Sequence, residues 1–249
     1  MRLSAAMNSM TPAEVLVRLA KDEDSYVRRA AARNSQTPAE ALSMFVTDED
    51  EMVRLRLAEG SQNVAQELLL LAKDKAADVR RAVAKNSLSP AEALSLLVND
   101  EDETVRSAVA RNTQTDCESL SLLAQDEVED VLRAVAGNRN TPKQDISRIC
   151  SLFFAEIFAL GCNGSEPSPG RRFLLTLPQC PADVLAKNFR SRSWLERYAI
   201  AGNSSTPEAV LEKMAKEGNQ LVRMASQKNL ECRPSAAEAL DQIEASSAT

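Results

Sequence analysis

The chain has 249 residues, of which 44% are hydrophobic but only 4% aromatic, and its formal net charge is −6 at pH 7. This balance predicts an aliphatic, alanine-rich core and weighs against bulk binding to nucleic acid or to a membrane surface. The sequence contains no histidine, which excludes Ser–His and Cys–His catalytic pairs and histidine–zinc sites.

The N-terminal stretch MRLSAAMNSM lacks the apolar segment of a signal peptide. The most apolar run, residues 152–162, is interrupted by Glu156 and is too short to span a bilayer. The five cysteines, at positions 117, 150, 162, 180 and 232, form no CxxC pair. These features predict a cytoplasmic protein with reduced thiols and without a membrane partner.

A 26-residue period organises the chain: asparagine recurs at positions 8, 34, 86, 112 and 138, with Gly60 at the missing step, and again at 203 and 229. Such a period indicates a repeat array. Glycine is scarce and the alternation typical of strands is absent, so we expect helices throughout. The sequence predicts one elongated repeat domain over residues 1–249, with regular repeats at 8–137, an irregular repeat with an insertion at 138–176, and further repeats at 177–249.

The first seven residues align with the end of a repeat, because Met1 stands where Val79 stands in a later copy. The chain thus begins in mid-repeat without the polar cap that terminal repeats need. We expect either that the N-terminus frays or that the natural chain extends upstream.

Four repeats open with a hydroxyl residue and a proline, and the third residue after the hydroxyl is Glu or Gln, as in Thr37, Pro38 and Glu40. The four hydroxyl residues are Thr11, Thr37, Ser89 and Thr141. This pattern predicts a capping box with proline at the first helical position. The apolar residues that follow, such as Leu42 and Phe45, have the spacing of one buried stripe. We call this first helix of a repeat helix A.

An acidic turn leads into a second helix, helix B, with apolar residues such as Val79, Ala82 and Val83. The small alanines allow neighbouring helices to approach closely. Helix B stops at the recurrent asparagine, and because Asn and Gly both tolerate left-handed backbone, we expect that conformation there. The alternative is an exposed row of asparagines that binds a ligand.

The string Asp-x-Asp-x-x-Val-Arg-x-Ala-x-Ala resembles the second half of a HEAT repeat. The longer pattern N-S-x-T-P-A-E-x-L-x-x-L-A-x-D-x-D-x-x-V-R-x-A-V-A-x-N resembles the bacterial leucine-rich repeat variant family, over about Met1–Ile149 and Pro181–Arg233. The resemblance implies an all-α, right-handed, HEAT-like solenoid of about nine two-helix repeats, with one helix per repeat of the 3₁₀ type in that family. The spacing itself leaves room for two α-helices of about nine or ten residues each.

The sixth repeat is irregular, because 39 residues separate Asn138 from the next equivalent position, Leu177. We expect a surface loop at 163–170 and a short helix at 171–177. Aromatic residues gather around this break: Phe153, Phe154, Phe158, Phe173, Phe189, Trp194 and Tyr198. They are expected to fill the core of the broken repeat, with an exposed groove or dimer contact as the alternative.

The seventh repeat is degenerate, with Cys180, Asn188 and Glu196 in place of the usual hydroxyl, leucine and valine. The eighth repeat, from Asn203, returns to the pattern. In the ninth, Leu240 and Ile243 take the core positions.

Two columns of opposite charge recur along the array. Aspartate starts the turn between the helices, arginine follows six residues later, and the eighth repeat has Glu217 and Arg223 at the same spacing. The arginine column is interrupted at Leu132. The resemblance to HEAT-like families implies that these residues form a structural ladder between neighbouring repeats rather than a catalytic site. The ladder residues are Asp22, Arg28, Asp48, Arg54, Asp74, Arg80, Asp100 and Arg106.

The acidic turns at 48–51 and 100–103 form either a solvated rim or a binding strip for a basic partner. Calcium is not expected, because no turn has the glycine and ligand spacing of an EF-hand. Helix B carries cations on its outer face: Arg29, Arg33, Arg81, Lys85, Arg111 and Arg133. The resemblance implies that helix B lines the concave surface, where these cations would bind an acidic segment of a partner protein. They could instead simply be favoured near helix C-termini.

The leading hypothesis is therefore a non-enzymatic scaffold for protein–protein interaction, with no cofactor and no metal. Nucleic-acid binding on the same strip is an alternative, since some HEAT-like DNA glycosylases have a basic concave face. However, aromatics for base stacking are sparse in the first five repeats. The leucine-rich repeat variant family also includes an iron–sulfur protein, but this chain has no cysteine before Cys117. Only Cys150, Cys162 and Cys180 could converge, and without cluster-type spacing.

Overall fold

The computed structural model describes residues 1–60, 65–159 and 169–233, and the side chains of 155–159 and 169 are not among those described. All 17 helices in these ranges are α-helices, and the same ranges contain no strand. The all-α prediction is therefore confirmed. Phe158, Cys162, most of the predicted loop at 163–170, and the positions of Leu240 and Ile243 lie outside the described residues or side chains.

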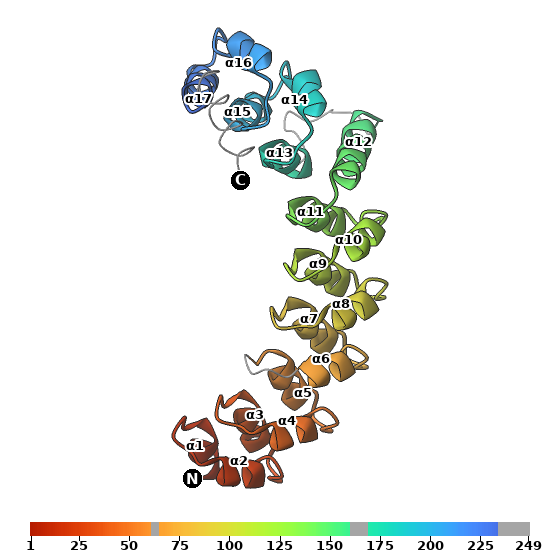
Figure 1. Ribbon diagram of the computed structural model, residues 1–249, viewed down its shortest axis with the longest axis vertical. Coiled ribbons are helices and arrows are strands. Elements are labelled where there is room, and N and C mark those ends of the chain that lie inside the picture. The colour runs from red at the N-terminus through yellow and green to blue at the C-terminus, as the bar shows by residue number, and fades with distance from the viewer. Residues whose placement is uncertain (61–64, 160–168, 234–249) are drawn as a thin grey trace, which may run out of the picture. The chain divides into compact units, whose positions relative to one another are not determined.

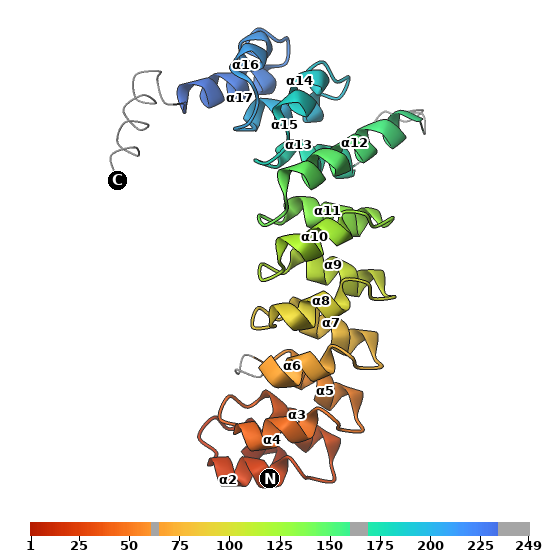
Figure 2. The same ribbon diagram turned by 45° about the vertical axis from the view of Figure 1, so that its right-hand side comes forward.

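The chain divides into two compact units, Met1–Asp145 and Ile146–Thr249, which we call unit 1 and unit 2. A single continuous array over the whole chain stays a prediction. Unit 1 is an α-solenoid of two helical layers (Figures 1 and 2).

One layer of unit 1 consists of B helices, each packed directly on the next one along the chain. The members of this B layer are α1 (Arg2–Met7), α3 (Ser25–Arg33), α5 (Glu51–Ala58), α7 (Ala77–Lys85), α9 (Glu103–Arg111) and α11 (Glu129–Gly137). Buried valines and alanines such as Val79, Val83 and Ala84 let these helices lie close together.

The other layer consists of A helices of seven residues, shorter than the nine or ten that the repeat length allows. The A layer comprises α2 (Ala13–Leu19), α4 (Ala39–Phe45), α6 (Ala65–Leu71), α8 (Ala91–Leu97) and α10 (Cys117–Leu123). In each A helix two leucines, or a leucine and Phe45, point into the core between the layers. The 3₁₀ helix implied by the resemblance is not seen within the described ranges.

The hydroxyl before each proline does not form the predicted capping box. Thr37 Oγ1 donates a 2.6 Å hydrogen bond back to the carbonyl of Ala31, near the end of the preceding B helix. Pro38 is the N-cap of α4 and has no side-chain cap. The prediction was wrong because the hydroxyl acts as a donor to the helix before it rather than as an acceptor for the helix after it. Thr11, Ser89, Thr141 and Thr206 repeat this bond, and so does Thr115, which precedes Asp116 instead of a proline.

The recurrent asparagine is also not left-handed. Asn112 has φ −71° and ψ 129°, which is extended backbone. Its side-chain Nδ2 donates to the carbonyls of Ala84 and Asn86 in the preceding repeat, at 2.8 and 2.9 Å, and its Oδ1 accepts from the backbone N–H of Gln114. Asparagine therefore recurs at this position because its side-chain amide joins two repeats and closes a turn. The same amide bridge is made by Asn34, Asn86, Asn138, Asn203 and Asn229.

Unit 2 contains most of α12 (Lys143–Ala159), which is 17 residues long and replaces a short A helix. It is followed by α13 (Pro169–Thr176), α14 (Ala182–Asn188), α15 (Trp194–Gly202), α16 (Glu208–Met214) and α17 (Gln220–Glu231). Because Asn203 bridges to the carbonyls of Leu175 and Leu177, α13 ends as a B helix does. Helices α13, α15 and α17 pack in succession as the B helices of this unit.

Candidate interaction surface

An arginine from each B helix joins two consecutive turns. Arg28 donates to both carboxylate oxygens of Asp48 in the next repeat, from Nε at 2.8 Å and Nη2 at 2.9 Å. Its Nη1 donates to the main-chain carbonyl of Asp22 in its own repeat at 2.8 Å. The guanidinium is buried, and the bidentate geometry makes this a strong contact. Arg54, Arg80 and Arg106 make the same contacts with Asp74, Asp100 and Asp126.

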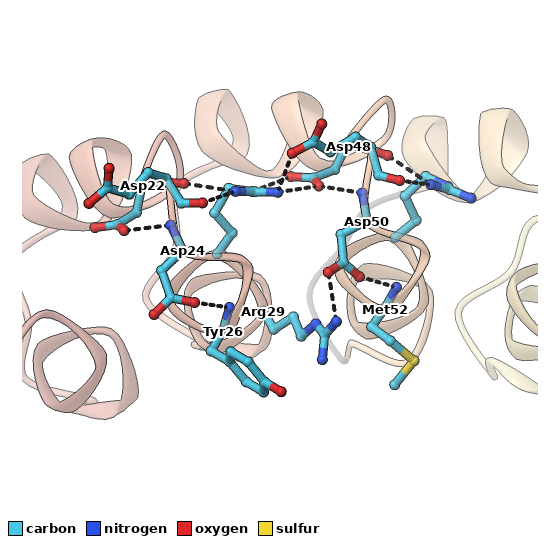
Figure 3. Close-up of polar contacts among 11 residues, drawn as sticks. Asp22, Asp24, Tyr26, Arg29, Asp48, Asp50 and Met52 are labelled. Atoms are coloured by element: carbon cyan, nitrogen blue, oxygen red, sulfur yellow. Dashed lines mark hydrogen bonds and ion pairs between the residues drawn. The ribbon is translucent and has the colours of Figure 1, made fainter.

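Each ladder aspartate also shapes its turn. Asp48 Oδ1 accepts from the backbone N–H of Asp50, while Asp50 accepts from the backbone N–H of Met52 at the start of α5 (Figure 3). Burial alone would raise the pKa of Asp74, but hydrogen bonds from Arg54 and from the N–H of Ala76 hold this pKa below its usual range. The hydrogen bond with Asp74 is in turn the main reason that the pKa of Arg54 is raised. We therefore expect both partners to stay charged at neutral pH.

The ladder continues beyond the eight residues predicted for it. Arg2 Nε lies 3.1 Å from Asp22, and in unit 2 Arg197 Nε lies 2.9 Å from Glu217. Leu132 interrupts the arginine column and is buried.

We call each arginine–acid pair of the ladder a rung, and one rung of unit 2 is built differently. Arg171 occupies the arginine position, but the residue 20 positions later is Ser191, not an acid. The carboxylate comes instead from Glu196, whose Oε1 lies 2.7 Å from Arg171 Nε and whose Oε2 accepts from Ser191 Oγ. Asn188 Oδ1 accepts from Arg171 at 3.0 Å. The sequence marks Asn188 and Glu196 as departures from the repeat, but their common contact with Arg171 is seen only in three dimensions.

Three of the six cations predicted to bind a partner are engaged in local ion pairs. Arg29 lies 2.6 Å from Asp50 in the next repeat and stacks on the Tyr26 ring (Figure 3). The hydrogen bond from Arg29 is the main reason that the pKa of Asp50 is lowered to about 2. Arg81 lies 2.5 Å from Asp78, and Arg133 contacts Asp130. Their charges are largely compensated.

The other three predicted cations, Arg33, Lys85 and Arg111, are exposed at the C-terminal ends of α3, α7 and α9. Among the described side chains no carboxylate pairs with any of them. Arg111 instead donates to the hydroxyl of Ser107 within its own helix.

Two adjoining depressions on the B layer share Arg81 and Lys85. The smaller one, of about 370 Å³, extends over α9 to Thr104, Ser107 and Arg111. The larger one, of about 570 Å³, extends over α5 to Leu55 and reaches Leu88. We call this pair of depressions the B-face site. It holds Arg81, Lys85 and Arg111 of the predicted set; Arg29, Arg33 and Arg133 do not line it.

The aromatic residues of unit 2 divide between core and surface. Phe153 is buried, and Phe154 lies half-buried beneath the Arg171 guanidinium at 4.5 Å. Phe173, Trp194 and Tyr198 are exposed, so the core-filling prediction is wrong for them. These residues face water because they lie at outward positions of α13 and α15.

The described residues contain no group of three or more histidines, cysteines or acids that could hold a metal ion. Cys150 and Cys180 are buried and their thiols share a hydrogen bond, which lowers the pKa of Cys150. Within the described ranges, no helix has both the length and the apolar character needed to cross a membrane.

Comparison with known proteins finds one matching family model and a similar solved structure. Residues 27–50, from α3 to the turn before α5, match the family model described as leucine rich repeat variant. This segment is therefore similar to a leucine-rich repeat variant repeat. A solved structure described as a leucine-rich repeat variant with a novel repetitive protein structural motif is similar over 87% of this chain and 81% of that chain, with a TM-score of 0.60 and 24% sequence identity.

Two designed armadillo repeat proteins, one of them described as made for modular peptide recognition, align over 92% of this chain and 90% of theirs. Their identities are 14% and 16%, and both TM-scores are 0.19. No curated protein sequence matches the chain. Arg28 and Asp48, which form one ion pair of the ladder, both lie within the segment that the family model matches.

Proposed function

We propose that this leucine-rich repeat variant protein is a non-enzymatic scaffold that binds an acidic segment of a partner protein at the B-face site. The observation that carries the proposal is the state of the charges there. Arg81 is paired with Asp78, Glu59 with Arg56, and Asp130 with Arg133. The lining charges left without an ion pair among the described side chains are Lys85, Arg111 and Glu103.

Among these unpaired lining charges the cations Lys85 and Arg111 outnumber the single acid Glu103, although the chain as a whole is acidic. Lys85 and Arg111 are exposed and lie in neighbouring helices, so both can attract the same incoming carboxylate segment. Leu55 and Leu88 line the larger depression, and Leu88 is 45% exposed. They offer an apolar contact beside the cations, so an acidic segment that also carries an apolar side chain fits best.

The experiment measures binding of a short fluorescein-labelled peptide of aspartate, glutamate and leucine by fluorescence anisotropy. Lys85→Glu/Arg111→Glu should weaken binding by at least about tenfold, since it reverses both uncompensated cations. The matched control is Lys21→Glu/Lys75→Glu, which changes net charge equally but replaces exposed lysines outside the B-face site. The control should bind as the wild type does.

Equal binding by Lys85→Glu/Arg111→Glu and the wild type would remove the basis for this proposal. A DNA duplex is tested in parallel. If the duplex binds more tightly than the peptide, with an affinity that falls steeply with salt, nucleic-acid binding replaces protein binding as the function of this surface.

A further inference from the structure

The outward side of the A layer carries a column of apolar side chains. Met44, Leu70, Leu96 and Leu122 occupy the same position in α4, α6, α8 and α10, each 26 residues after the last. Leu70, Leu96 and Leu122 are 53%, 48% and 50% exposed, and Met44 is half-buried. We call these four residues the A-face column.

The fold does not require apolar residues at this position. In α8 the core side is already filled by Leu94 and Leu97, which are 0% and 1% exposed on either side of Leu96. In α2 the same position holds Arg18, which is exposed. A single exposed leucine is ordinary on a protein surface, but a contiguous row of them marks an interaction site.

Carboxylates lie close to three of the four residues of the A-face column. One helical turn before the apolar residues stand Glu40, Glu92 and Glu118, all exposed, and Gln66 takes this place in α6. At the end of the column, Leu122 also lines a depression of about 510 Å³ together with Asp126 and Glu127. Asp126 is held by Arg106, whereas Glu127 has no ion pair among the described side chains.

We propose that the A-face column binds one amphipathic helix of a partner protein, with an apolar ridge flanked by lysine and arginine. Packed helices lie about 8–10 Å apart, and seven residues of an α-helix rise by about 10.5 Å. A partner helix lying along the layer can thus place one apolar residue against each repeat if its apolar residues are seven positions apart. Its flanking cations meet Glu92 and Glu118, in the usual manner of a helix bound to an apolar groove.

The same carboxylates disfavour other occupants. An anionic membrane surface repels Glu92, Glu118 and Glu127, and a second copy of the chain would bring two glutamate rows together. The A-face column contains no residue of the B-face site, so the two proposals succeed or fail separately.

The probe is a synthetic helical peptide with leucine at every seventh position and lysine on both flanks, measured by isothermal titration calorimetry. The variant Leu70→Ser/Leu96→Ser/Leu122→Ser should bind it at least about tenfold more weakly than the wild type. The control Leu221→Ser/Met224→Ser removes two apolar side chains of α17 that are 51% and 56% exposed, and should bind normally. A matched peptide with glutamate flanks should not bind the wild type.

A second variant, Glu92→Lys/Glu118→Lys, leaves the leucines in place and should reject the lysine peptide while accepting the glutamate peptide. Circular dichroism checks that each variant keeps its helix content. Unchanged affinity in both variants would overturn the proposal. It would also be overturned if the leucines were needed instead for self-association in sedimentation, or for binding vesicles of phosphatidylcholine and phosphatidylglycerol.

Discussion

Glu196 stands where regular repeats carry a buried valine, yet its side chain is as buried as that valine would be. A buried carboxylate is costly unless a cation and hydrogen bonds compensate it. Arg171 and Ser191 supply both, and Ser191 itself occupies the position at which other rungs have their acid. In this rung the carboxylate is supplied by position 196 instead of position 191.

This exchange makes a prediction that two substitutions can test. Glu196→Val alone leaves the Arg171 guanidinium buried without its carboxylate, so the free energy of unfolding should fall by about 3 kcal/mol. Adding Ser191→Asp rebuilds the rung of the regular repeats, and Ser191→Asp/Glu196→Val should recover most of that loss. Ser191→Asp alone should destabilise, because it places two carboxylates together. Urea unfolding followed by circular dichroism measures the free energy of unfolding of all three variants. An unchanged free energy of unfolding in Glu196→Val would contradict the assignment of Glu196 as the acid of this rung.

At the scale of the helix, the period and the apolar spacing were enough to predict which residues pack inward, as Leu42, Phe45 and Val79 do. The helix ends were predicted wrongly because one sequence pattern fits two bonding schemes. A threonine before proline can accept from the helix that follows or donate to the helix that precedes it. Likewise, asparagine suits both a left-handed residue and an amide bridge, and only the neighbouring repeat decides between them.

The candidate site, too, was only partly predictable from the sequence. Sequence position identified the outward cations of helix B, but not which of them are neutralised. Arg29 is paired with Asp50, 21 residues away, and this pairing depends on how consecutive repeats stack. Lys85 and Arg111 have the same repeat position as Glu59, and only the fold shows that they border a depression.

The bonding scheme at the start of α4 can be tested directly. Thr37→Val keeps the shape of the side chain but removes the donor to the Ala31 carbonyl, so we expect a loss of about 1–2 kcal/mol in unfolding free energy. Glu40→Ala removes the residue that a capping box would require, and because Glu40 is exposed and Pro38 has no N–H, it should cost less than about 0.5 kcal/mol. Thermal unfolding of the two variants compares them. A larger loss of unfolding free energy for Glu40→Ala than for Thr37→Val would support the capping box instead.

For the whole molecule, the relevant fact is where the two series of contacts between repeats stop: the arginine–acid rungs and the asparagine amide bridges. The arginine position holds Leu132 in the fifth repeat, and the asparagine position holds Leu177 after the sixth. Neither leucine can donate the hydrogen bonds by which Arg106 and Asn112 join their repeats. Repeat arrays are held together by contacts between neighbours, so cooperativity depends on each of these links. The boundary between unit 1 and unit 2, at residues 145 and 146, falls between these two positions in the sequence.

We therefore expect urea to unfold the two units in separate transitions. The single tryptophan, Trp194, lies in unit 2, so its fluorescence reports that unit alone, whereas circular dichroism reports the helices of both. Unit 1 has four complete aspartate–arginine rungs from Arg28 to Asp126, and unit 2 has one regular rung and the substituted one. The fluorescence transition should accordingly have its midpoint at a lower urea concentration than the main dichroism transition. Coincident midpoints with one cooperative transition would show that the units unfold together despite the missing links.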